Sequence, residues 1–104
     1  MTNIQVELPS HIDGAVDVFM SIIGKIREIN ETPGPEADKF DVVYDLIVDS
    51  LIKAQRKCPG CISNDKIKYY KRLFRDCISI NAIIQQMNAS IRKGQEVIHR
   101  RKLL

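Results

Sequence analysis

What the sequence lacks excludes several classes of protein. No stretch of the 104 residues approaches the ~18 consecutive apolar residues that a membrane-spanning helix needs, so we expect no membrane partner. The first residues, MTNIQVELPSHID, lack the basic segment followed by an apolar run that marks a secretory signal. Cysteine is scarce, with three copies, which suits a reducing compartment. These absences predict a cytoplasmic protein.

The patterns of common catalytic sites are missing too. The chain has no Ser/His/Asp set, no glycine-rich phosphate loop and no pair of carboxylates placed to converge. Its two histidines, His11 and His99, are interpreted as ordinary surface residues rather than as ligands. We therefore expect no enzymatic activity, no cofactor, no bound metal and no small-molecule substrate.

Charge is distributed unevenly along the chain. Residues 1–49 hold ten acids and three bases, a net −7, and residues 50–104 hold three acids and thirteen bases, a net +10, which together give +3. Such asymmetry suggests a basic face for an anionic partner. Of the two main candidates, nucleic acid and an anionic membrane surface, we expect nucleic acid. The alternative is a dipolar protein whose halves attract each other. The length predicts a single domain, 1–104, small enough for self-association to add stability.

Two helices are expected in the acidic half, at about residues 10–30 and 36–57. Pro9 and Ser10 are typical of a helix start, with Ser10 as the N-cap, and the segment NETPGPEAD predicts the loop between the helices. The first helix has a broad apolar side, which predicts that it packs against two neighbouring helices. This side is formed by Ile12, Ala15, Val16, Phe19, Ile22, Ile23, Ile26 and Ile29. The second has a core face of Phe40, Val43, Ile47, Leu51 and Ala54. An acidic row on another face is interpreted as solvated: Asp38, Asp41, Asp45 and Asp49.

The segment CPGC, residues 58–61, ends the second helix and leaves three alternatives open. Two thiols at this spacing are compatible with a plain turn, with a disulfide or redox pair, or with half of a zinc site. Cys77 would be about 12 residues, or ~18 Å, along the next helix, which is too far to complete a zinc site. Zinc would therefore need His11 or a second chain.

The last segment has the longest regular pattern. Apolar residues recur every three or four positions, which predicts one long helix over about residues 65–101. A kink near residues 79–81, where Ser79 could cap a restart, is the competing interpretation. A helix of this length exposes more apolar seam than its own chain covers, which predicts dimerisation. The expected dimer core comprises Tyr70, Leu73, Cys77, Ile80, Ile84, Met87 and Ile91.

A basic stripe is expected on the opposite side of this helix. Its residues are Lys68, Lys71, Arg72, Arg75, Ser79, Gln86, Ser90, Arg92 and Lys93. Its two cationic clusters would be about 20 residues, or ~30 Å, apart along one axis, which suits an elongated polyanion. Because aromatic platforms for unpaired bases are missing from the stripe, a duplex recognised by shape is favoured over single strands. The tail HRRKLL is expected to add phosphate attraction, to act as a nuclear-targeting patch or to complement the dipole of the last helix.

A family resemblance is carried by ELPSHIDGAVDVFM, residues 7–20, which has the pattern E-L-P-x-x-I-x-x-A-V-x-x-x-M. This segment, about a sixth of the chain, resembles the opening helix of the nodavirus double-stranded-RNA-binding suppressors of RNA silencing. The resemblance implies an all-helical homodimer that lays a basic helical face along an RNA duplex without reading sequence. It implies a viral protein of the host cytoplasm that shields duplex RNA from the dicing machinery.

Two later segments compete as the equivalent of the family's RNA-binding helix. The sequence LIKA, residues 51–54, resembles an L-x-K-A element of that helix and would give Lys53 an RNA-contact role. Alternatively, the last helix resembles the family's RNA-binding helix in pattern, with Met87 at the place of a core methionine. Ser79 and Gln86 depart from this pattern, because basic residues are expected at their positions. We favour the last helix and keep Lys53 as a secondary candidate.

Together these observations predict an all-α protein, with antiparallel helical hairpins and one long C-terminal helix, assembling as a homodimeric bundle. The predicted function is sequence-independent binding of double-stranded RNA. The competing hypothesis is a non-enzymatic module for oligomerisation or protein interaction, whose basic face docks an acidic partner.

Overall fold

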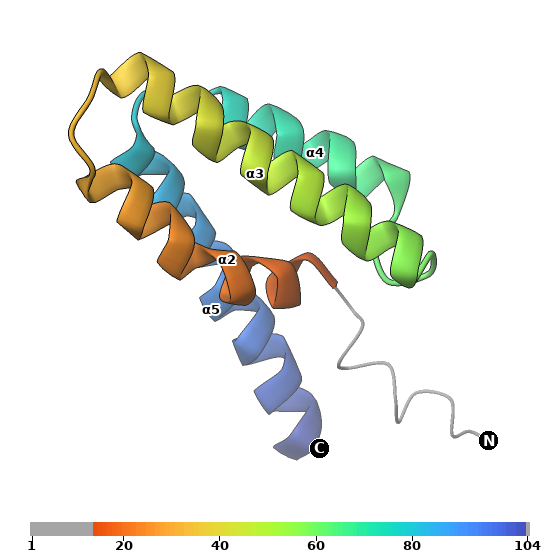
Figure 1. Ribbon diagram of the computed structural model, residues 1–104. Coiled ribbons are helices and arrows are strands. Elements are labelled where there is room, and N and C mark those ends of the chain that lie inside the picture. Colours follow the sequence, from red (N-terminus) through yellow and green to blue (C-terminus); the bar gives the residue numbers. More distant parts are fainter. Residues whose placement is uncertain (1–13, 104) are drawn as a thin grey trace.

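The computed structural model describes residues 14–103, with side chains over residues 14–96. These residues form four helices: α2, Gly14–Glu31; α3, Glu36–Lys57; α4, Asn64–Arg75; and α5, Ile80–Leu103 (Figure 1). No strand occurs in this range, and the prediction of an all-α protein is confirmed. The predicted helix start at Ser10 lies outside the described residues.

The loop between α2 and α3 closes both helices. The hydroxyl of Thr32 donates to the carbonyl of Ile29 at 2.7 Å, and Lys39 Nζ donates to the carbonyls of Asn30 and Thr32 at 3.1 and 2.9 Å. These bonds satisfy carbonyls that the end of a helix leaves without partners. Gly34 has φ +139°, which side chains rarely tolerate, and Pro35 precedes the first residue of α3.

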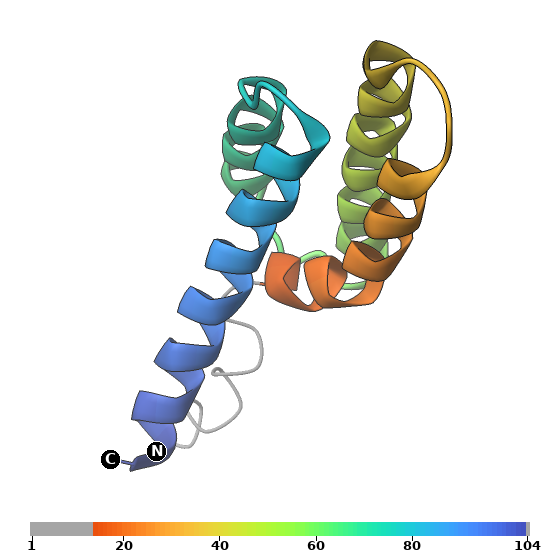
Figure 2. The same ribbon diagram turned by 90° about the vertical axis from the view of Figure 1, so that its left-hand side faces the viewer.

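The helices are arranged around α2, which packs against both α3 and α5, while α4 lies beside α3 (Figure 1). Figure 2 shows α5 passing the start of α2 and continuing beyond it. The broad apolar side of the first helix therefore has the two neighbours that the sequence predicts. The two helices approach closely at Gly94 of α5, where a Cβ would lie 2.5 Å from Cγ2 of Val16 of α2.

The core joins all four helices. Phe19 of α2 meets the rings of Tyr70 and Phe74 of α4 edge-on, with centroids 4.9 and 5.5 Å apart. The same core contains fully buried aliphatic side chains from α2, α3, α5 and the loop before α4: Ile26, Val43, Ile47, Leu51, Ile62, Ile80, Ile83 and Met87. Burying each such side chain is worth about 1.5–3 kcal/mol, so the chain has a core of its own.

The predicted single helix over residues 65–101 is wrong. Helix α4 ends at Arg75, and α5 begins at Ile80 in a new direction, so that the two helices diverge from the turn between them (Figures 1 and 2). The competing interpretation, a restart capped by Ser79, describes the chain better. Ser79 Oγ accepts a hydrogen bond from the Ala82 N–H at 3.1 Å, which is the contact of an N-cap.

A residue from α3 also stabilises the start of α5. Glu36 Oε2 accepts a hydrogen bond from the Ile80 N–H at 2.9 Å, and its negative charge lies at the positive end of the α5 dipole. A neighbouring bond, from Asn30 Nδ2 to Asn81 Oδ1 at 3.0 Å, joins the end of α2 to the same turn. The break is thus held by four side chains, and two of them, Glu36 and Asn30, come from other helices.

Candidate nucleic-acid interface

Helix α4 separates its apolar side from its cations. Ile67, Tyr70 and Phe74 point into the core. The opposite side exposes four bases: Lys68, Lys71, Arg72 and Arg75. Within the described residues, the side chains of Lys68, Lys71 and Arg72 form no ion pair or hydrogen bond. Their charges are therefore available to an external anion.

Arg75 has a partner in the neighbouring helix. Its guanidinium carbon lies 4.9 Å from the ring centroid of Tyr44 of α3, a cation–π contact worth about 0.5–1 kcal/mol at an exposed site. The contact places the end of α4 beside the acidic half of α3, where Asp41 and Asp45 are exposed on either side of Tyr44 in sequence. Arg75 thus packs against the part of α3 that carries the acidic residues.

The other end of the same helix pair is more strongly basic. Lys53, Arg56 and Lys57 are exposed in the last two turns of α3. Gln55 Nε2 donates to the Ile62 carbonyl at 3.0 Å and to Asn64 Oδ1 at 2.8 Å, which ties this end of α3 to the start of α4. We define the α3–α4 basic surface as these residues: Lys53, Arg56, Lys57, Lys68, Lys71, Arg72 and Arg75.

The predicted stripe is not continuous. Ser79 is half-buried and its hydroxyl caps α5, so it does not face a ligand freely. The remaining predicted residues lie on α5, away from α4: Gln86, Arg92 and Lys93 are exposed, and Ser90 is half-buried. The lysines and arginines of α4 and Lys53 of α3 therefore lie on two helices that pack side by side, whereas the second cationic cluster lies on α5.

The predicted dimer seam is largely used within one chain. Tyr70, Ile80 and Met87 are 4%, 0% and 0% exposed in a single copy, so they have little surface to offer a twin. The other four residues are half-buried against the same core: Leu73, Cys77, Ile84 and Ile91. The physical reason is the break at 76–79, because the turned-back α5 is covered by α2.

Three features of this surface were not among the predicted site residues. Arg56 and Lys57 follow Lys53 on exposed positions, and their place in a basic last turn was the available signal. Tyr69 is 56% exposed between Lys68 and Arg72 on α4, so the expectation that no aromatic ring accompanies the stripe is wrong. Lys66 Nζ lies 5.8 Å from the centroid of this ring.

A shallow hollow of about 560 Å³ lies at the turn between α4 and α5. Its apolar part includes Leu73, Cys77 and Ile78, and Ile78 is 94% exposed. Burial, and next the charge of Asp76, raise the pKa of the Cys77 thiol. A raised pKa lowers the share of thiolate, the nucleophilic form of cysteine.

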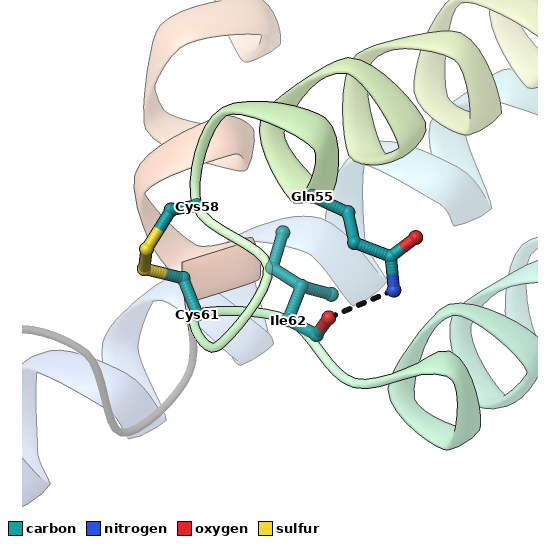
Figure 3. Close-up of a disulfide and its surroundings, with 4 residues drawn as sticks. All are labelled: Gln55, Cys58, Cys61 and Ile62. Carbon is teal, nitrogen blue, oxygen red and sulfur yellow. Dashed lines mark hydrogen bonds between the residues drawn. A yellow bond between two sulfur atoms is a disulfide. The ribbon is translucent and has the colours of Figure 1, made fainter.

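The CPGC segment forms a turn closed by a disulfide between Cys58 and Cys61 (Figure 3). Of the three alternatives left open by the sequence, the structure thus has the disulfide. Among the described residues, no group of three or more His, Cys, Asp or Glu side chains is placed to hold a metal ion. The side chains of His11 and His99 lie outside the described part of the chain.

The chain matches no family model, no curated protein and no solved structure. None of the helices in the described range is both long enough and apolar enough to cross a bilayer.

Proposed function

We propose that the protein binds double-stranded RNA without reading its sequence, through the α3–α4 basic surface. The observation that carries the proposal is the set of exposed α4 bases, Lys68, Lys71 and Arg72, which have no anionic partner within the described chain. Lysine and arginine side chains placed in this way neutralise phosphates and carry no base information.

The size of the surface limits the contact. Helix α4 has 12 residues and is therefore about 18 Å long, whereas the predicted single helix would have been about 55 Å long. A duplex would lie across the α3–α4 pair, with its phosphates nearest the end that holds Lys53, Arg56 and Lys57. The wide, shallow groove of A-form RNA admits such a helical face.

The proposal includes the biological role implied by the resemblance of residues 7–20 to nodavirus suppressors. Bound in the host cytoplasm, the protein would cover duplex RNA and deny it to dicing enzymes without performing catalysis itself. A second copy is part of this proposal. It would have to associate through surface that the single chain leaves exposed, because the predicted seam is mostly buried.

The first experiment measures binding to an RNA duplex of arbitrary sequence at several salt concentrations. If about four lysine or arginine side chains contact phosphates, the logarithm of the binding constant should fall against the logarithm of the salt concentration with a slope of about −4. Arg72→Ala should weaken binding and make the slope shallower by about one. Two exposed bases outside the surface, Lys25→Ala on α2 and Arg92→Ala on α5, are charge-matched controls and should change the slope much less.

Comparison of a duplex with one of its own strands tests the preference for double-stranded RNA. Tyr69 offers a ring on which an unpaired base could stack, so Tyr69→Leu is measured with both ligands. We expect tighter binding of the duplex and little effect of this substitution on it. Equal affinity for both ligands, with single-strand binding lost in Tyr69→Leu, would replace the duplex by single-stranded RNA as the ligand.

A second candidate is an interaction module in which the α3–α4 basic surface docks the acidic half of another copy. Charge complementarity favours it, since Asp38, Asp45 and Asp49 are exposed on the same helix that ends in bases. It predicts a complex between copies of the chain that survives nuclease treatment and weakens as the salt concentration rises. It also predicts that the protein does not shift an RNA band on a gel at moderate salt. Sedimentation of the free protein beside the gel shift separates the two.

A further inference from the structure

The CPGC turn is positioned to act on other parts of the fold. Its disulfide joins Cys58 and Cys61, with 5.4 Å between their Cα atoms, and the Cys61 N–H donates to the Cys58 carbonyl at 2.9 Å. Pro59 and Gly60 are exposed, and the two cysteines are half-buried. Figure 3 shows the sulfur atoms on the side of the loop away from Gln55, so the bond is not enclosed by the α3 contact.

The first residue of α2 rests directly on this turn. The Gly14 N–H donates to the Cys61 carbonyl at 3.1 Å. A Cβ at residue 14 would lie 2.8 Å from that carbonyl oxygen and 3.0 Å from both Cys61 Cβ and Ile62 Cγ1. The start of α2 therefore depends on the position of Cys61, with no side chain between the two backbones.

The contact continues from α2 to α5. Val16 follows in the first turn of α2, is 6% exposed, and meets the bare backbone of Gly94. The disulfide-closed turn, the first turn of α2 and the middle of α5 thus form a continuous series of close contacts. These contacts link the turn to α5 through the first turn of α2.

We infer that the Cys58–Cys61 bond is a redox site that controls the docking of the first turn of α2. An external dithiol would reduce the bond by thiol–disulfide exchange. The two electrons and two protons of the dithiol pass to the cysteine sulfurs, which become thiols, and the dithiol becomes a cyclic disulfide. The opened turn gains conformational freedom, and the Gly14 contact loosens. This inference is independent of RNA binding.

The third cysteine does not compete in this exchange. Cys77 lies on the far side of α4, at the turn to α5, and its Sγ is 3.5 Å from the Leu73 carbonyl oxygen. Burial, and next the charge of Asp76, raise the pKa of its thiol and so lower its share of thiolate, which is the form that attacks a disulfide. The redox chemistry is therefore confined to the CPGC pair.

The experiment compares hydrogen exchange and melting of the full chain before and after treatment with dithiothreitol. Intact mass after alkylation first establishes how many thiols are free in each state. On reduction, amides at the start of α2 should exchange about tenfold faster, amides of α4 should change little, and the melting temperature should fall by about 5–10 °C. Cys58→Ser/Cys61→Ser should reproduce the reduced state, and Cys77→Ser should respond as the wild type does.

A further variant separates docking from sulfur chemistry. Gly14→Ala leaves the disulfide intact but inserts a methyl group against Cys61, so it should speed exchange in the same α2 amides without any reductant. Equal exchange and equal melting temperature in oxidised and reduced wild type would overturn the inference. So would the finding that the reduced pair from two chains binds one zinc ion, because the turn would then be a metal site.

Discussion

Ser79→Ala is the substitution that most directly tests the break between α4 and α5. The serine hydroxyl accepts a hydrogen bond from the Ala82 N–H at 3.1 Å, three residues into α5. In this position alanine removes the acceptor and leaves a helix-terminal N–H without its partner. Loss of such an N-cap costs about 1 kcal/mol, within a range of about 0.5–2 kcal/mol. We therefore expect the free energy of unfolding to fall by that amount.

The opposite sign is expected if residues 65–101 form one helix in solution. Residue 79 would then be in a helix interior, where alanine is favoured over serine by a few tenths of a kcal/mol. Ser21→Ala is the matched control, because Ser21 is inside α2 and its hydroxyl donates to the Val18 carbonyl at 2.7 Å. That variant should show the small gain in the free energy of unfolding that comes from replacing a serine in a helix interior by alanine.

Urea denaturation followed by far-ultraviolet circular dichroism measures both variants. The expected result is a lower midpoint for Ser79→Ala, an unchanged or slightly higher midpoint for Ser21→Ala, and equal m-values for both. Glu36→Ala adds a second measurement, since it removes the acceptor of the Ile80 N–H from a different helix. Stabilisation by Ser79→Ala, with no effect of Glu36→Ala, would refute the capped break and restore the single helix.

Substitution of two helical glycines and alkylation of Cys77 test other parts of the fold. Gly24→Ala should raise the free energy of unfolding by about 1 kcal/mol, because nothing lies within 4 Å of the added Cβ inside α2. Gly94→Ala should instead lower the free energy of unfolding by about 1 kcal/mol, because the cost of overpacking against Val16 exceeds the same gain in helix propensity. Equal effects of Gly24→Ala and Gly94→Ala in urea denaturation would contradict the α2–α5 contact. At pH 8, iodoacetamide should alkylate Cys77 several-fold more slowly than an exposed cysteine, because burial and then Asp76 raise its pKa. Asp76→Asn removes the charge and should speed the reaction, as measured by mass spectrometry; an unchanged rate would leave burial as the sole cause.

The sequence was sufficient for the first two helices because their signals are local and agree. Proline and glycine mark the loop at residues 32–35, and the apolar spacing of each helix matches the face that is buried. The same reasoning predicted that the first helix has two neighbours, since its apolar side is too broad for one. What it could not give is which helices these are, because that depends on where the chain turns later.

The spacing of apolar residues did not predict the break after Arg75, and the reason is geometric. Leu73, Cys77 and Ile80 are spaced by four and three residues, as in a helix, but a turn at residues 76–79 also brings all three to the core. Apolar spacing therefore does not distinguish a straight helix from two helices that share one core. The local signal was Ser79, and its strength depends partly on Glu36, which is distant in sequence.

The turn also changes how the positive charges act on a ligand. On one straight helix, the cations near residue 72 and those at 92–93 would add along a single line facing a duplex. In the structure, the lysines and arginines of α4 instead lie on a helix that packs beside α3, and Arg75 contacts Tyr44 in the acidic half of α3. Exposed charges farther apart than the Debye length of about 8 Å at physiological ionic strength are largely screened from one another. If the protein binds RNA as proposed, the attraction for phosphate would therefore come mainly from the lysines and arginines of α4 and the end of α3, and only weakly from those of α5.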